Sequence, residues 1–371
     1  MTYPEQSAEP FDDVLRIAVL RGGGLGDLLF ALPAIDALAA AYPYARITLL
    51  GTPIAKALLE GRPGPVDAIE LLPPARGVHG ADEADDPAAV AGFLDRMRAE
   101  RFDVAFQLHG GGRNSNPFVR ALGARYTVGA MTPDAAPLDR SLPYIYYQHE
   151  VFRWLEVVAL AGAPEVGHEP RIVVREDERD AARAALGDGS ASLVVVHPGA
   201  SDPRRRWPAE RFAEVARRCA EDGSRVVVVG DGADAETADA VAAEASVESF
   251  ARRLTLSGLA GLLSVADLFI GNDSGPRHLA QAVGAPTVGL FWFGNIVNGG
   301  PITRGRHRAH LGWTTHCPVC GRDVTQVGWT SERCEHDPSF LTGIAVDDIY
   351  ADVRALLDSR LTATRAPALG R

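Results

Sequence analysis

Short runs of branched apolar residues alternate with helix-periodic segments along this chain, and they do so in two successive series. The first series begins with "VLRIAVL" at 14–20, followed by a glycine-rich turn and a helical segment at 28–41. The second begins with "LVVVHPG" at 193–199, followed by a helical segment at 208–223. Strands that are apolar along their whole length and alternate with helices are typical of parallel sheets covered on both faces. The pattern therefore predicts an α/β chain with two doubly wound parallel-sheet domains.

A polar, charged segment at 175–192 separates the two series. We place the domain boundary near its end, which gives domains of residues 1–188 and 189–371. A chain of 371 residues with 46% apolar content exceeds the size at which a single core stops growing. The second domain ends in an amphipathic helix at 345–361, which we expect to pack across the domain junction. Ligands of such sheets gather beyond the carboxyl ends of the strands, so we expect the two domains to face a cleft.

Charge and composition narrow the function classes. The formal net charge of −11 argues against a general nucleic-acid-binding protein, because neutralising phosphates needs a basic surface. The chain has no run of about 18 apolar residues, and its N-terminus lacks the basic start and apolar stretch of a secretory signal. We therefore expect a cytoplasmic protein with at most peripheral membrane contact, in which a local basic site holds any anionic ligand.

The turn "RGGGLGD" at 21–27 begins like a dinucleotide-binding fingerprint, but Asp27 stands where the last glycine should be. A carboxylate there would repel a bound pyrophosphate, which disfavours a nicotinamide site. The glycines, Gly24 and Gly26 among them, let the turn come close to a ligand. Two interpretations of Asp27 remain open: an acidic residue that favours the start of a helix, or a general base within reach of an acceptor hydroxyl.

A second motif, "FIGNDSGPRHLA" at 269–280, places a turn between a strand and a helix. Free N–H groups at a helix start bind phosphate, so Ser274 and Gly275 are the predicted diphosphate contacts. Asp273 is either a ligand contact or a helix cap alone. His278, one turn inside the helix, is either a ligand contact or a core histidine.

Three successive arginines follow the strand at 193–199. Arg205 and Arg206 would place fixed positive charge at the carboxyl end of the second sheet, where guanidinium groups match phosphate oxygens. The alternative is an ordinary solvated basic loop. Because this loop and the Asp273 turn lie at the same edge of one sheet, we favour a nucleoside-diphosphate site.

The chain also has a candidate metal site. Its ligands would be Cys317, Cys320, Cys334 and His336, which suit a structural zinc ion in a closed site. The single residue between Cys334 and His336 is not the spacing of a standard zinc ribbon.

The segment "QLHGGGRNSN" at 107–116 offers His109, Arg113 and Asn114 as acceptor-side residues. The alternative is that these three residues serve the structure of the loop alone.

At these motifs the chain resembles glycosyltransferase family 9, the ADP-heptose:lipopolysaccharide heptosyltransferase group. The resemblance runs from the strand at 14–20 through "HPGASDPRRRWPAERFAEVA" and "FIGNDSGPRHLAQAVGAPTVGLF" to the C-terminal helix. It implies a GT-B architecture, with the acceptor approached from the first domain and the donor bound by the second. It also implies inversion at the anomeric carbon without a catalytic metal or cofactor. The implied partners are a nucleotide-sugar donor, with ADP-heptose favoured, and a glycan or glycolipid-type acceptor.

The resemblance assigns roles to individual residues. Asp27 falls at the aspartate taken to be the catalytic base, and Arg205, with Arg206 beside it, stands where the family usually has a lysine that contacts the diphosphate. The segment that meets the sugar and diphosphate of the donor is represented here by Asp273, Ser274, Gly275 and His278. Two alternatives are a sugar-nucleotide-binding protein without turnover and a nicotinamide-dependent oxidoreductase, which the missing last glycine disfavours.

Overall fold

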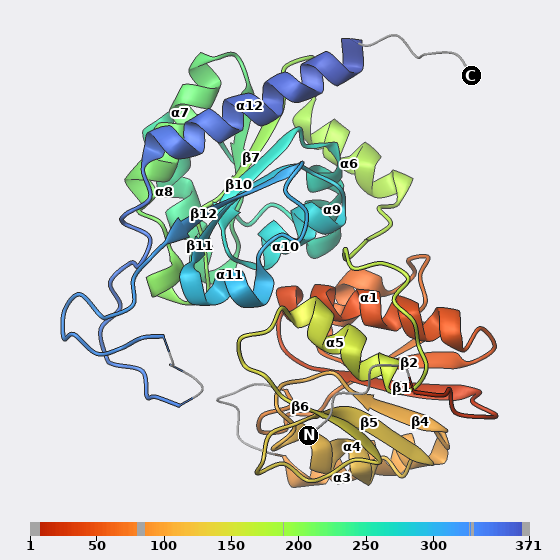
Figure 1. Ribbon diagram of the computed structural model, residues 1–371. Helices are drawn as coiled ribbons and strands as arrows, with labels where there is room; N and C mark the ends of the chain where they lie inside the picture. Colours follow the sequence, from red (N-terminus) through yellow and green to blue (C-terminus); the bar gives the residue numbers. More distant parts are fainter. Residues whose placement is uncertain (1–7, 80–85, 188, 326, 328–329, 366–371) are drawn as a thin grey trace. The chain divides into compact units, whose positions relative to one another are not determined.

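The computed structural model describes residues 8–79, 86–187, 189–325, 327 and 330–365. The chain divides into two compact units, Met1–Val173 and Val174–Arg371. Each unit contains a six-stranded parallel sheet with helices packed on it (Figure 1). The two parallel sheets confirm the α/β class that the sequence predicts.

The division lies before the polar segment at 175–192 rather than near its end, because that segment contains α6 (Glu176–Leu186) of the second unit. Glu178 and Ala182 are buried on the inner face of α6, which packs against α9 (Leu256–Val265). The helices meet closely at Gly261, where an added Cβ would lie 2.3 Å from the carbonyl oxygen of Glu178. The charged residues that make the segment look like a linker form the outer face of this helix.

The strands of the first unit are arranged in the order β3-β2-β1-β4-β5-β6. All neighbouring strands are parallel. The strands are β1 (Arg16–Arg21), β2 (Arg46–Gly51), β3 (Ala68–Leu71), β4 (Val104–Gln107), β5 (Tyr126–Met131) and β6 (Arg140–Pro143). The chain runs outward from β1 and then returns to β4 on the other side, so the order reverses between these two strands. Ligands of doubly wound sheets bind at this kind of reversal, beyond the carboxyl ends of the strands.

The helices of the first unit are α1 (Leu25–Ala41), α2 (Pro53–Leu59), α3 (Pro87–Ala99), α4 (Ser115–Ala121) and α5 (Glu150–Ala159). Helix α1 follows β1 after the turn at 22–24 and packs against α5 (Figure 1). Leu28, Leu32 and Ile35 of α1 are buried. These buried residues hold α1 on the first unit, and the helix begins at the point where the strand order reverses.

The second unit repeats this topology, with the strand order β12-β11-β10-β7-β8-β9. The strands are β7 (Leu193–His197), β8 (Arg225–Val228), β9 (Glu248–Ser249), β10 (Leu268–Asn272), β11 (Thr287–Trp292) and β12 (His307–Gly312). All neighbouring strands are again parallel. Here the order reverses between β7 and β10, which are the strands that precede the arginine run and the Asp273 turn.

The remaining helices of the second unit are α7 (Ala209–Glu221), α8 (Ala235–Ala245), α10 (Gly275–Ala282), α11 (Phe293–Gly299) and α12 (Val346–Arg365), with short 3-10 turns η1 (Pro203–Arg205) and η2 (Gly232–Asp234). The C-terminal helix α12 packs on the core of its own unit. Ile349, Val353 and Leu356 of α12 belong to the apolar core of the second unit. None of the helices in the described ranges combines the length and hydropathy that crossing a bilayer requires.

Candidate functional site

The glycine-rich turn lies at the reversal point of the first sheet, between the end of β1 and the start of α1. An added Cβ on Gly22 would lie 1.9 Å from the carbonyl oxygen of Val78, and Gly23 has a φ of +87° and lies against the carboxylate of Asp27. These two glycines therefore make room for the protein's own chain, which is a different use from the ligand approach that the sequence suggests. Gly24 is the N-cap residue of α1, and Gly26 is in its first turn.

Asp27 caps the start of α1 and keeps part of its carboxylate exposed. Its Oδ2 accepts a hydrogen bond of 2.9 Å from the backbone N–H of Gly24, which caps the helix. Its Oδ1 forms an ion pair of 2.9 Å with Nη2 of Arg21, and 49% of the Asp27 side chain remains exposed. A carboxylate oxygen can accept more than one hydrogen bond, so the cap leaves acceptor capacity on the exposed side.

Arg21 is the residue that sequence reasoning missed at this site. Its side chain is 2% exposed. Its Nε donates to the carbonyl oxygen of Asp27 at 2.7 Å, and its Nη1 donates to the carbonyl oxygen of Leu108. Its Nη2 also reaches Glu150 of α5 at 3.4 Å, and its guanidinium lies over the ring of Trp154. Burial lowers the pKa of Arg21 and the charge of Asp27 opposes that shift, so the guanidinium joins β1, α1 and α5 around Asp27.

The loop after β4 brings one of the three acceptor-side candidates to this site. His109 is bonded to the backbone of Gly22 and Gly77, and burial, together with the charge of Arg21, lowers its pKa to about 4. Arg113 is exposed and forms an ion pair of 3.0 Å with Asp134. His109 is therefore a neutral side chain at pH 7 beside the glycine turn, whereas Arg113 is paired with Asp134 of the segment after β5.

Asn114 precedes α4 as its N-cap residue, without a side-chain cap bond. Its amide packs against the backbone at Gly77, where an added Cβ would lie 2.1 Å from Nδ2 of Asn114. This contact ties the loop after β4 to the loop that contains Val78.

At the reversal point of the second sheet, Asn272 holds both ends of the segment at 198–207, which we call the arginine loop. Nδ2 of Asn272 donates to the carbonyl oxygen of Pro198 at 2.7 Å, and Oδ1 of Asn272 accepts from the N–H of Trp207 at 3.0 Å. Because Asn272 is fully buried at the end of β10, the loop is fixed to the neighbouring strand. The two hydrogen bonds to Asn272 therefore define where the arginine loop begins and ends.

Asp273 is a buried anion with three donors. Oδ1 accepts from Nε2 of His278 at 3.0 Å, and Oδ2 accepts from Nδ2 of Asn295 at 2.8 Å and from Nη1 of Arg205 at 3.4 Å. Burial alone would raise the pKa of Asp273, but the hydrogen bond from His278 and the charges of Arg205 and Arg277 lower it to about 2. The N-cap residue of α10 is Ser274, so Asp273 is not the cap; its carboxylate holds Arg205, His278 and Asn295.

His278 supports Asp273 through a defined tautomer. Arg277 donates to Nδ1 of His278, and a guanidinium can only donate, so Nδ1 must be an acceptor. The proton of the neutral ring is then on Nε2, which donates to Asp273. Both ring nitrogens thus have protein partners, and His278 acts through Asp273 in this structure.

The arginines separate into two groups. Arg204 is buried and forms a bidentate ion pair with Asp202. Its Nε donates to Oδ1 at 3.0 Å and its Nη2 donates to Oδ2 at 2.6 Å. Arg205 and Arg206 keep 25% and 32% of their side chains exposed. The solvated-loop interpretation therefore does not describe Arg204, and only the other two can meet a ligand.

The exposed pair is oriented by neighbouring groups. Nη2 of Arg205 donates to Oγ of Ser201 at 2.9 Å, and Arg206 donates to the carbonyl oxygen of Ala200 and pairs with Asp234 at 3.2 Å. The first turn of α10 begins beside Arg205, because Asp273, which directly precedes the N-cap residue Ser274, is 3.4 Å from Nη1 of Arg205.

Arg277 adds a third cation to Arg205 and Arg206, although burial lowers its pKa to about 10. These three arginines outnumber the carboxylates of Asp234 and Asp273 around them. Within the described residues the group therefore has excess positive charge, which suits an anionic ligand.

The cysteines and the histidine of the predicted metal site lie together. One ligand atom from each of Cys317, Cys320, Cys334 and His336 lies within 4.8 Å of all the others. Three sulfur atoms and one imidazole at this spacing fit the donors and the size of a tetrahedral site. A hydrogen bond from the backbone of Cys320 lowers the pKa of Cys317 to about 7. This favours the thiolate form, which a metal needs.

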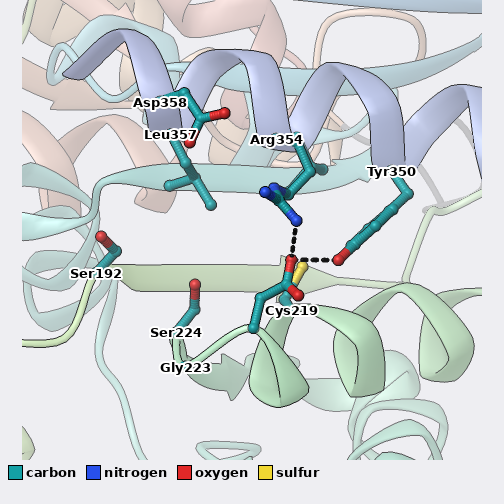
Figure 2. Close-up of a pocket in the computed structure, with 10 residues that line it drawn as sticks. Ser192, Cys219, Gly223, Ser224, Tyr350, Arg354, Leu357 and Asp358 are labelled. Carbon is teal, nitrogen blue, oxygen red and sulfur yellow. Dashed lines mark hydrogen bonds and ion pairs between the residues drawn. The ribbon is translucent and has the colours of Figure 1, made fainter. Parts of the chain in front are cut away.

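A cavity of about 210 Å³ lies at the opposite edge of the second sheet (Figure 2). Ser192 and Ser224, which line it, come directly before β7 and β8, so the cavity is at the amino ends of these strands. Asp222 in its wall is already bonded to Tyr350 and Arg354. The candidate donor residues follow the carboxyl ends of β7 and β10, and this cavity is separate from them.

Comparison with known proteins identifies the family of the chain. The model of glycosyltransferase family 9 (heptosyltransferase) matches residues 90–317. The chain belongs to glycosyltransferase family 9. This assignment replaces the oxidoreductase alternative and confirms the resemblance seen in the sequence motifs.

Relatives of this family 9 chain include the lipopolysaccharide core heptosyltransferase OpsX of Haemophilus influenzae, which is 22% identical over 92% of this chain and 96% of its own length. Among solved structures, a family 9 glycosyltransferase from Veillonella parvula matches with a TM-score of 0.75 and 21% identity, covering 95% of this chain and all of the other. ADP-heptose lps heptosyltransferase II of E. coli matches with a TM-score of 0.73 and 18% identity over 94% of this chain and all of the other. These likenesses establish the GT-B fold.

Several residues of the two sites had no role assigned from the sequence. Arg21 could have been found from the sequence, because it is a charged residue at the end of an otherwise apolar strand. Asn272 could have been found as the first residue of the predicted turn. Glu150 and Asn295 come from α5 and α11, far along the chain from the residues they contact. No local pattern could have placed these two.

Proposed function

We propose that this family 9 chain transfers a heptose-type sugar from ADP-heptose to a hydroxyl group of a lipopolysaccharide-core saccharide, with inversion at the anomeric carbon. The observation that supports this most is the carboxylate of Asp27, which is held by Arg21 and Gly24 and is still half exposed. The relatives of the chain are named as lipopolysaccharide heptosyltransferases. The four free thiols suit a reducing compartment, so we assign the reaction to the cytoplasm.

In the proposed reaction Asp27 accepts the proton of the acceptor hydroxyl. The hydroxyl oxygen forms its bond to the anomeric carbon from one face, and the bond from that carbon to the diphosphate oxygen breaks on the opposite face. Inversion follows from this single displacement. The sugar of the bound donor must come within reach of Asp27 in the reacting complex, and this requirement is part of the proposal.

The leaving diphosphate would be stabilised by groups that are already oriented. Arg205 and Arg206 are fixed by Asp273 and Asp234 and keep part of each guanidinium exposed. The amide groups at Ser274 and Gly275 begin α10 and favour negative charge. Such preorganised donors stabilise developing charge, so we propose that departure of ADP needs no catalytic metal.

We propose a structural role for the metal site. Cys317, Cys320, Cys334 and His336 would hold one zinc ion through four protein ligands, which leaves no open position for substrate. A closed site of this kind contributes to the stability of the segment that folds around it.

The test of the base is Asp27→Asn in the full chain, with ADP-heptose and a truncated lipopolysaccharide core as substrates. Asparagine keeps the size of the side chain and an oxygen that can cap α1, but it cannot accept the proton. We expect kcat to fall by about 10²- to 10⁴-fold, with the affinity for ADP unchanged. Release of ADP and the anomeric configuration of the product are measured.

The matched control is Asp86→Asn, because Asp86 also caps a helix, accepting from the N–H of Ala89 at 2.9 Å. We expect its turnover to equal that of the wild type. Unchanged turnover in Asp27→Asn would refute the base assignment. Binding of ADP-heptose without release of ADP by the wild-type chain would support the alternative of a binding protein without turnover.

A further inference from the structure

The segment that contains the candidate metal ligands is bonded directly to the arginine loop. We call residues 313–341, as far as they are described, the cysteine loop. The backbone N–H of Phe340 donates to the carbonyl oxygen of Arg204 at 2.8 Å. The hydroxyl of Ser339 donates to the carbonyl oxygen of Arg206. These two bonds fix the backbone on either side of Arg205, which is the central residue of the proposed diphosphate site.

Side chains join the same two loops. The guanidinium of Arg204 lies over the ring of Phe340, with 5.5 Å to the ring centroid. The carboxylate of Asp202 holds Arg204 at 2.6 Å and is also 3.7 Å from Nη2 of Arg333 in the cysteine loop. Arg204 is therefore turned away from the proposed ligand and toward the cysteine loop.

Phe340 connects this contact to the candidate metal ligands. It is buried in one small apolar cluster with Cys317, Val324 and Cys334. Its carbonyl oxygen also accepts from Oγ1 of Thr314 at 3.0 Å, close before the CxxC pair. The position of Phe340 thus depends on the packing around the two buried cysteines.

We propose that a metal ion in the Cys/His cluster holds Phe340 and Ser339 against the arginine loop, and so increases the affinity of the chain for a nucleoside diphosphate. Phe340 and Ser339 are positioning residues in this inference, because they touch the loop and not the ligand. The inference rests on the proposed function in one respect, the assignment of Arg205 and Arg206 to the diphosphate. Coupling of two sites must be reciprocal, so ADP then increases the affinity for the metal by the same factor.

The experiment measures ADP binding by calorimetry with the full chain loaded with zinc, stripped by a chelator, and reloaded. Couplings between two sites are typically about 5- to 150-fold, so we expect at least about fivefold weaker ADP binding in the stripped protein and recovery on reloading. Zinc affinity should rise by the same factor in the presence of ADP. Hydrogen exchange at 198–207 should be faster in the stripped protein, while exchange in α8 and β8 is unchanged.

Two variants separate the coupling from the integrity of the metal site. Ser339→Ala removes one bond to the arginine loop and no metal ligand, so we expect a full equivalent of zinc with weaker ADP binding. Cys219→Ala is the control, because Cys219 is a buried cysteine of the core around α7, and we expect wild-type zinc content and ADP affinity.

Equal ADP affinity in the loaded and stripped proteins would overturn the inference, as would a chain that binds no zinc. If the loaded wild type binds no ADP, the assigned donor site is wrong. In that case the exchange rates at 198–207 still report on the coupling, and equal rates with and without zinc would refute it.

Discussion

Asp27 shows how one side chain can serve the fold and the proposed reaction together. One carboxylate oxygen caps α1 and the other is paired with Arg21, whose guanidinium is buried. The guanidinium of Arg21 joins Asp27 to β1, α1 and α5, and so keeps the carboxylate in one place. We infer that Arg21 is a positioning residue for Asp27, since an exposed carboxylate on a first helical turn would otherwise adopt several rotamers.

Two buried neutral histidines make the stability of the fold sensitive to pH. Burial, assisted by Arg206, lowers the pKa of His197 to about 4, and burial with Arg21 does the same for His109. An unfolded histidine titrates near 6.5. Between these pH values the unfolded chain binds more protons, so acidification favours unfolding, by on the order of 3 kcal/mol per histidine once the pH has fallen to about 4.

We therefore expect the free energy of unfolding to decrease as the pH falls from about 6.5 to about 4, and we expect His197→Gln to decrease less steeply in this window. Urea unfolding at a series of pH values measures this. An equal slope in His197→Gln and the wild type would contradict the assignment of a buried neutral histidine.

At the scale of elements, the alternation of strands and helices can be predicted from the sequence, but the packing of helices that are far apart along the chain cannot. The runs before Asp27 and Asp273 are apolar because β1 and β10 are buried on both faces, and this signal is local. Helix α6 lies in the polar segment that the sequence places before the domain boundary, because most of its surface is charged and only Glu178 and Ala182 are buried in it. Its partner α9 is some seventy residues away, and no local pattern shows that they pack.

The close contact of α6 and α9 predicts a difference between two glycines of α9. Gly261→Ala would place a Cβ 2.3 Å from the backbone oxygen of Glu178, so the helices must separate, and we expect a loss of about 1–3 kcal/mol. Gly258→Ala meets its nearest atom, Oγ1 of Thr255, at 3.4 Å, and alanine favours helix. We expect unchanged or higher stability there. Chemical denaturation compares the two, and equal losses would show that α6 does not pack as described.

At the scale of the molecule, the division at Val173–Val174 assigns α6 to the second unit. We expect a fragment of residues 174–371 to fold cooperatively and to bind ADP like the full chain. A fragment of residues 189–371 lacks α6 and exposes the face of α9, so we expect it to lose at least about 2 kcal/mol, the scale of one buried apolar side chain. Thermal unfolding and ADP calorimetry test this. Equal stability of the two fragments would favour the boundary near residue 188.

The sequence by itself determined the α/β class, the two successive sheets, the residues at the ends of β1, β7 and β10, and the candidate Cys/His cluster. These depend on local periodicity, on turn residues and on short spacings. Only the tertiary structure decided that Arg21 holds Asp27, that Asn295 reaches Asp273, and that the cysteine loop is bonded to the arginine loop. Such contacts join residues that are distant along the chain or whose partners are chosen by packing, and packing is a property of the folded whole.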